Sequence, residues 1–288
     1  LAGQTVARAD LPVAADGVLD VALDIPDFMR WSPEQPTLYN AGFAWQQAGA
    51  VVAAAQRRIG FRQLAADGNR TLLNGQPVCL RGALSWGWDP DVIAPYYTPD
   101  KARQEFRILR AMGFNLVKLC LFLPNQAYFD SADEEGMLLW VEFPMWLPEV
   151  TEALCAQAPG EYADYVRLTR HHPSVVLYTL GCEMDRSVGS ALLGTLNRVV
   201  RDSVSHVLVC DNSGSGESYG GLDFDFADFT DYHPYYDLHY FEPLLDNWRR
   251  DWKPPRPWIF GEFNDQDGFR DHAELVAAAE GEKPWWMT

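Results

Sequence analysis

The sequence lacks long hydrophobic runs and any ordered set of cysteines. Its 288 residues contain no apolar stretch of about 18 or more residues and no signal-peptide pattern at the start, so no membrane-spanning helix is expected. The five cysteines are scattered and form no C-x-x-C pair, which argues against a disulfide framework and against a zinc site. The compartment stays open between the cytoplasm and export.

Positive charge is also scarce. The 23 Lys and Arg residues stand against 40 Asp and Glu residues, which gives a net charge of −17. A surface that neutralises phosphate is therefore not expected, and neither nucleic acid nor an anionic membrane is a favoured partner. A neutral sugar would be indifferent to this charge. Whether the chain forms a homo-oligomer stays open.

Several catalytic motifs are missing as well. The chain has no H-E-x-x-H helix of a metalloprotease and no G-x-S-x-G elbow of a serine hydrolase. The glycine-rich stretch at 214–221 lacks the Lys-Ser/Thr pair of a phosphate-binding loop, so it is interpreted as a flexible loop. No cofactor and no metal is implied.

From residue 82 onward, short apolar runs alternate with helical segments. Seven strands are predicted within 81–88, 114–124, 137–144, 173–183, 206–214, 225–236 and 257–263, and helices over 99–112, 126–135, 162–170, 191–204, 238–250 and 271–280. Eight strand–helix units close a (β/α)8 barrel. We therefore expect an α/β fold with a TIM-type barrel over residues 63–288, whose last strand is missing from the chain.

Residues 1–62 have β character and no helical pattern. Apolar residues alternate over 18–26, and two more strand-like runs follow before residue 64. Two or three strands are too few to close a core alone, so this segment is expected to be the end of a β-sandwich domain. The chain begins at Leu1, and it is expected to belong to a longer polypeptide. A hairpin with Asn-Gly and Asp-Gly turns is predicted over 64–81.

Two of the predicted strands end in a glycine and a glutamate. The first, 173–183, closes with Glu183, and the second, 257–262, closes with Glu262. The carboxyl ends of barrel strands share one mouth, so the two carboxylates could face each other there. Glycoside hydrolysis uses such a pair, with one carboxyl group as acid/base and the other as nucleophile or base. Taken alone, Glu183 is as well explained as a solvated loop residue.

Several stretches resemble glycoside hydrolase family 2, which contains β-galactosidases, β-glucuronidases and β-mannosidases. The resembling motifs, in family order, are WSPEQPTLY with IGFR, LLNGQPVCLRG, MGFNLVKL, DEEGMLLWVEFP and HHPSVVLYTLGCE. The resemblance covers nearly the whole chain and implies an immunoglobulin-like sandwich before the barrel. It also implies a retaining mechanism, with Glu183 as acid/base and Glu262 as nucleophile. Retaining enzymes hold the two carboxyl groups roughly 5–5.5 Å apart.

Two positions depart from the family pattern. Cys182 stands where the family has an Asn that is expected to hold the 2-hydroxyl group of the sugar. A thiol is a weak donor and a poor acceptor, so this contact is handled differently, activity is low, or the site has changed to another task. Lys118 stands where Arg is usual, a milder change.

Further substrate-binding candidates follow the predicted strands. Tyr235 matches a family tyrosine that bonds the nucleophile, and His233 beside it could bind sugar hydroxyl groups or be structural. Glu142 could orient a hydroxyl group or pair with Lys118. Trp86 and Trp88 could stack on a sugar or belong to the core, and Trp146 is a weaker candidate of the same kind.

The sequence thus predicts a retaining β-glycosidase that works through Glu183 and Glu262. The alternative is a carbohydrate-binding or structural protein of the same fold that has lost efficient catalysis. Cys182 and the missing last strand favour the alternative, whereas the two glutamates at strand ends favour the enzyme. The sequence does not identify the sugar.

Overall fold

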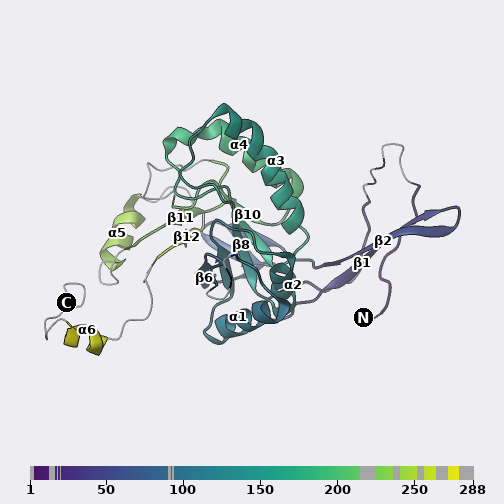
Figure 1. The fold of residues 1–288 in the computed structure, drawn as a ribbon, viewed down its shortest axis with the longest axis horizontal. Coiled ribbons are helices and arrows are strands. Elements are labelled where there is room, and N and C mark those ends of the chain that lie inside the picture. Colours follow the sequence, from purple (N-terminus) through teal and green to yellow (C-terminus); the bar gives the residue numbers. More distant parts are fainter. Residues whose placement is uncertain are drawn as a thin grey trace.

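The computed structural model describes residues 3–12, 17, 19, 21–89, 92, 94–214, 225–235, 241–251, 256–263 and 272–278. A parallel sheet of five strands lies at its centre (Figure 1). Its strands are β6 (Gly82–Ser85), β7 (Leu116–Leu119), β8 (Leu138–Glu142), β9 (Val175–Thr179) and β10 (Leu208–Cys210), hydrogen-bonded in sequence order. Such neighbouring parallel strands need crossover connections, and helices supply them.

The crossover helices are α1 (Pro99–Ala111), α2 (Gln126–Glu135), α3 (Glu152–Thr169) and α4 (Gly189–Ser203), with a 3-10 turn η1 (Arg186–Val188) before the last. Two later strands, β11 (Thr230–Tyr232) and β12 (Trp258–Phe260), form a separate parallel pair, and α5 (Phe241–Asp251) and α6 (His272–Ala278) follow β11 and β12. The predicted parallel α/β arrangement is confirmed for the described residues. Closure into a barrel stays a prediction. No helix in the described ranges is long and apolar enough to cross a membrane.

The strands bury both faces because their residues alternate between two apolar clusters. In β7, Val117 and Leu119 pack among the helices, whereas Leu116 faces the other way. We call the second set the inner cluster; its members are Trp31, Leu64, Leu73, Leu116, Leu138, Trp140, Val176, Leu177, Leu208, Cys210 and Phe229. Burying each large apolar side chain contributes about 1.5–3 kcal/mol. Both faces therefore hold the sheet firmly beneath the strand ends.

Helix boundaries follow local signals, with one correction. Thr98 caps α1 by accepting a hydrogen bond from the Lys101 amide at 3.3 Å, and α2 has the predicted bounds. The prediction that α3 starts at residue 162 is wrong. The helix begins ten residues earlier, where the Thr151 hydroxyl accepts a hydrogen bond from the Leu154 amide at 3.1 Å. Pro159 is a helix-breaking signal in sequence, but it lies inside this helix.

The amino-terminal segment contains the second correction. The described residues between 17 and 26 form no strand and are largely exposed, because no neighbouring strand pairs with them in the described part of the chain. The next two predicted strands do form, as the hairpin β1 (Tyr39–Gln47) and β2 (Ala50–Ile59), which projects away from the parallel sheet (Figure 1). The predicted hairpin also forms, as β3 (Leu64–Asp67), β4 (Arg70–Leu73) and β5 (Gln76–Pro77). The division at residue 62 stays a prediction.

Trp31 fastens this segment to the amino end of the sheet. Its side chain is fully buried, and its indole Nε1 donates a hydrogen bond to the main-chain oxygen of Asp133 at 2.9 Å. The Asp133 carboxylate also accepts from the Ser174 amide at 3.0 Å and contacts His172 Nδ1 at 2.6 Å. This buried group of hydrogen bonds thus connects the start of β9 to α2 and to the segment that contains Trp31.

We predict that Gly136→Ala destabilises the protein far more than Gly113→Ala. Both glycines end helices with positive φ, at 70° and 91°. A Cβ at Gly113 would meet open space, whereas one at Gly136 would lie 2.4 Å from the main-chain oxygen of Pro33. Gly113→Ala should cost about 1 kcal/mol from its left-handed backbone alone, and Gly136→Ala at least about 3 kcal/mol because the main chain must also shift. Denaturant unfolding measures both; equal costs would contradict the prediction.

Candidate active site

The two glutamates at strand ends lie on the same side of the structure, at the carboxyl ends of their strands, and both contact His233. Glu183 follows β9, and Glu262 follows β12. Glu183 has φ of 49°, a left-handed conformation that costs a non-glycine residue about 1–2 kcal/mol. Three hydrogen bonds hold the loop in this shape. The amide of Cys182 donates to Met145 O at 2.9 Å, that of Glu183 to Ser213 O at 2.8 Å, and that of Met184 to Asn212 Oδ1 at 2.9 Å.

The strained backbone aims the Glu183 carboxylate at two nitrogen atoms. His233 Nδ1 lies 3.1 Å from Oε1, and the indole Nε1 of Trp146 donates to Oε2 at 3.1 Å. The Glu183 side chain is 12% exposed, so it is not sealed from solvent. Backbone strain that is over-determined by its surroundings is typical of functional sites.

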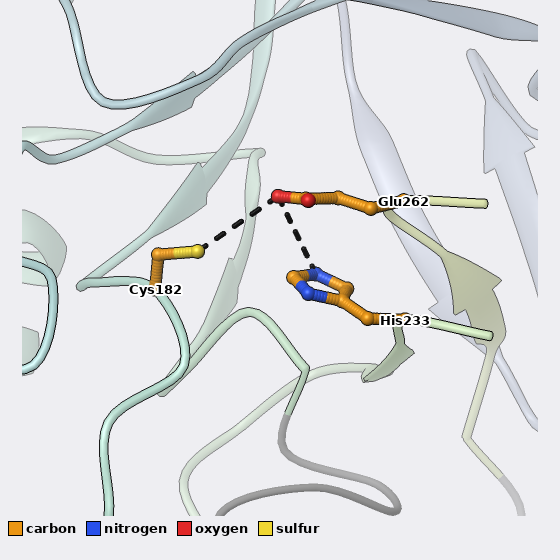
Figure 2. Close-up of side chains that lie close together, drawn as sticks. All are labelled: Cys182, His233 and Glu262. Carbon is orange, nitrogen blue, oxygen red and sulfur yellow. Dashed lines mark hydrogen bonds and ion pairs between the residues drawn. The ribbon is translucent and has the colours of Figure 1, made fainter. Parts of the chain in front are cut away.

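Glu262 is more deeply buried and is contacted at both oxygens. Oε1 lies 3.1 Å from Lys118 Nζ, and the Tyr235 hydroxyl donates to Oε2. The thiols of Cys120 and Cys182 approach Oε1 at 3.7 and 3.8 Å. Figure 2 shows Cys182 and His233 reaching the Glu262 carboxylate from two sides.

Lys118 is the cation that makes this burial possible. Its ammonium group lies 2.9 Å from Glu142 Oε1 and 3.1 Å from Glu262 Oε1, and it donates to Ser213 Oγ at 2.7 Å. The ammonium also lies 5.0 Å from the Trp140 ring centroid. Burial alone would lower the pKa of Lys118, but the charges of nearby carboxylates, chiefly Glu142, raise it well above its ordinary value.

His233 lies at the end of β11 between several acids. Its Nε2 is 2.8 Å from Ser213 Oγ, 3.5 Å from Asp231 Oδ2 and 3.7 Å from Glu262 Oε1. Burial lowers the pKa of His233, but Asp231 and then Glu183 outweigh it and raise that pKa to about 10. Burial conversely raises the pKa of Asp231, but His233 and Lys118 bring it below its ordinary value. The raised pKa favours the imidazolium form of His233 at neutral pH.

The thiols near Glu262 are neutral. Burial and then the charge of Glu142 raise the pKa of both Cys120 and Cys182. Ligand atoms of Cys182, His233 and Glu262 lie within 4.8 Å of one another, a spacing that could surround a metal ion. Lys118 competes for the same Glu262 oxygen, and the imidazole and thiol both carry protons. The arrangement therefore suits a hydrogen-bonded network, and we assign no metal to it.

The structure brings most of the predicted site residues together. They are Glu183, Glu262, Tyr235, His233, Cys182, Glu142 and Lys118. Of the two alternatives for Glu142, pairing with Lys118 is the one the structure shows. Trp86 and Trp88 are 58% and 77% exposed, which excludes the core alternative, but their side chains make no described contact with either glutamate.

Sequence reasoning missed Ser213, Asp231 and Cys120, and it ranked Trp146 too low. Each of the four lies on a strand of the site or shortly after one. Their position near a strand end could have identified them as candidates. However, β10 and β11 have only three residues each, so their strand patterns in the sequence are weak.

Comparisons with known proteins bear on this site. The sequence profile described as Glycosyl hydrolases family 2 matches residues 3–62. A putative β-glucuronidase of Formosa agariphila is 28% identical over 156 residues, which are 54% of this chain and 19% of that protein. A β-galactosidase of Pectobacterium atrosepticum is 26% identical over 178 residues, 56% of this chain and 16% of that protein.

The predicted resemblance to glycoside hydrolase family 2 is confirmed. The matches to these curated proteins span about a fifth of their length or less. Solved structures of two glycosidases share the fold. A Bacteroides uniformis β-glucuronidase, covalently bound to cyclophellitol-6-carboxylate aziridine, has a TM-score of 0.73 at 21% identity, over 86% of this chain and 32% of that one. A family 2 β-galacturonidase of Eisenbergiella tayi, bound to galacturonate, has a TM-score of 0.74 at 19% identity. The match covers 87% of this chain and 47% of that one.

The raised pKa of His233 predicts how its contribution to stability changes with pH. The protonated ring stabilises the folded state, and this contribution is complete below the unfolded pKa of about 6.5. It should decline as pH rises from there and vanish near pH 10, the folded pKa. The difference in free energy of unfolding between wild type and His233→Asn should therefore shrink between pH 6.5 and 10. Denaturant unfolding at several pH values measures it; a constant difference would contradict the assignment.

Proposed function

We propose that this chain carries the active site of a retaining β-glycosidase. The observation that carries the proposal is the pair of carboxylates with unlike surroundings. Glu262 is buried against Lys118 and Tyr235, whereas Glu183 lies nearer to solvent between His233 and Trp146. Two carboxyl groups with different tasks are what glycoside hydrolysis requires.

In this mechanism Glu262 is the nucleophile. The ammonium of Lys118 lies 3.1 Å from Oε1 of Glu262, and the Tyr235 hydroxyl donates to Oε2 and orients the carboxylate. Attack on the anomeric carbon forms a glycosyl ester, while Glu183 gives a proton to the leaving oxygen. Glu183 then takes a proton from water, and the hydroxide hydrolyses the ester with net retention.

We propose for the whole fold a (β/α)8 barrel over 63–288, preceded by the end of an immunoglobulin-like sandwich in 1–62. Two contacts between the five-stranded sheet and the segment before β11 support closure. The Asp228 amide donates to Val209 O at 2.9 Å, and the Asp228 carboxylate accepts from the Val209 amide at 2.8 Å. The family 2 profile ends at residue 62, in agreement with the proposed boundary.

The proposed substrate is a β-glycoside of a hexose or a hexuronic acid. The relatives named above are a β-glucuronidase and a β-galactosidase, and the structural neighbours a β-glucuronidase and a β-galacturonidase. The first substrates to assay for hydrolysis are therefore aryl β-glucuronides, β-galactosides and β-galacturonides. Binding of these sugars without turnover would support the alternative, a carbohydrate-binding protein without catalysis.

The roles of the two glutamates predict opposite products in azide. Glu262→Ala should lower kcat/KM by at least about 10³-fold, and azide should restore turnover with an α-glycosyl azide as product. Glu183→Ala should be rescued to the β-glycosyl azide, because the enzyme ester then reacts with azide. Proton NMR identifies the anomers. The same azide from both variants, or β-azide from Glu262→Ala, would refute the assignment.

The neutral thiol at position 182 predicts a gain from Cys182→Asn. An amide can bond the 2-hydroxyl group of a sugar, a contact that strengthens in the transition state. One added hydrogen bond of about 1.4 kcal/mol corresponds to about tenfold in kcat/KM. Cys182→Ala is the matched control, and glycosides without the 2-hydroxyl group should show no gain. An equal gain on 2-deoxy substrates would contradict this role.

A further inference from the structure

We infer that His233 holds the proton that Glu183 delivers to the leaving group, so that the two side chains work as one acid. This inference rests on the proposed function and deepens it. It makes His233 a positioning residue, because it acts through Glu183 and need not touch the reacting atoms. The geometric basis is the 3.1 Å contact between His233 Nδ1 and Glu183 Oε1.

The tautomer of His233 follows from the hydrogen bonds of Ser213. The Ser213 hydroxyl accepts from Lys118 Nζ at 2.7 Å and donates its single proton to Asp231 Oδ2 at 2.6 Å. At 2.8 Å from the same oxygen, His233 Nε2 must therefore be the donor. The proton on Nε2 is fixed, and only Nδ1 is available for proton exchange.

The Nδ1···Oε1 contact then shares one proton. Either Nδ1 carries it and donates to an ionised Glu183, or Glu183 carries it and donates to a neutral imidazole. Trp146 donates to the other oxygen, Oε2, which leaves Oε1 as the atom on the proton path. The two states differ only in where this proton rests.

The charges around the ring favour the state with the proton on His233. The ionisable groups that face it, by contact or by charge, are Glu183, Asp231, Glu262, Lys118, Tyr235 and Cys182. Three are carboxylates, Lys118 is the opposing cation, and the thiol is neutral. The side chain is 1% exposed, so solvent screens these charges little. The free site thereby stores a proton and keeps Glu183 ionised.

The proton balance closes over the catalytic cycle. In the first step the Nδ1–H bond breaks and an O–H bond forms at Oε1; that proton then passes to the leaving oxygen, which takes the electron pair of the broken C–O bond. In the second step Glu183 removes a proton from water and returns it to Nδ1. The imidazole is neutral only while the sugar is attached to Glu262.

Two variants separate proton storage from hydrogen bonding. His233→Asn retains an N–H donor close to Nδ1, so it can still orient Glu183, but an amide cannot hold a transferable proton. His233→Gln places its amide closer to Nε2 and tests the Ser213 contact alone. His206→Asn, at an exposed histidine, is the matched control.

The kinetic test compares two leaving groups on the same sugar. A phenyl glycoside needs protonation and a 2,4-dinitrophenyl glycoside does not. His233→Asn should lower kcat/KM for the phenyl glycoside by about 100-fold, with less than about threefold loss for the dinitrophenyl glycoside. In the pH profile of kcat/KM for the phenyl glycoside, the alkaline limb should also move to lower pH by about one unit or more. An equal loss of kcat/KM on both glycosides, or an alkaline limb at the same pH as in wild type, would overturn the inference.

A spectroscopic test works even without turnover. Nitrogen-15 NMR of labelled histidines should show both His233 nitrogens protonated at pH 7.5, and Glu183→Gln should lower the pH at which Nδ1 loses its proton. A neutral His233 at pH 7.5, or a titration unchanged by Glu183→Gln, would overturn the inference. If the NMR result holds but wild type hydrolyses no glycoside, the proposed function fails while the shared proton stands.

Discussion

A single buried ammonium group holds the acidic site together. Lys118 rises from the inner face of β7 and contacts Glu142 from β8 and Glu262 after β12. Each buried carboxylate would cost several kcal/mol without a partner, so two of them can share this interior only because the cation compensates both. Through Ser213 the same ammonium reaches Asp231 and His233. The strands position the acidic side chains, and the Lys118 ammonium compensates their negative charge.

Much of the fold could be predicted because its signals are local. Short apolar runs, the cap at Thr98 and the Asp-Gly and Asn-Gly turns predicted the strands, helices and hairpin of the described part. The strand predicted over 18–26 was wrong because alternation shows that a segment can be a strand, not that a partner pairs with it. The start of α3 was missed; Thr151 caps the helix, and Pro159 inside it is a residue that ordinarily ends a helix.

The site was predictable where chemistry and strand ends coincide, as at Glu183, Glu262 and Tyr235. It was not predictable where a role depends on which groups meet in space. Ser213 is an ordinary loop serine in sequence, but its one proton fixes the tautomer of His233. Cys182 remains the main departure from the family pattern, and the structure turns its neutral thiol toward Glu262 (Figure 2). The thiol contacts the Glu262 carboxylate without displacing it from Lys118, so the departure leaves the proposed nucleophile in place.

The most direct test of the account is covalent trapping of the nucleophile. A 2-deoxy-2-fluoro β-glycoside with a dinitrophenyl leaving group forms the glycosyl ester faster than water removes it, and peptide mass spectrometry locates the label. The account predicts one fluorosugar per chain, attached to Glu262. A label on Glu183 or on the Cys182 sulfur, or an unlabelled protein that hydrolyses the parent glycoside, would contradict it.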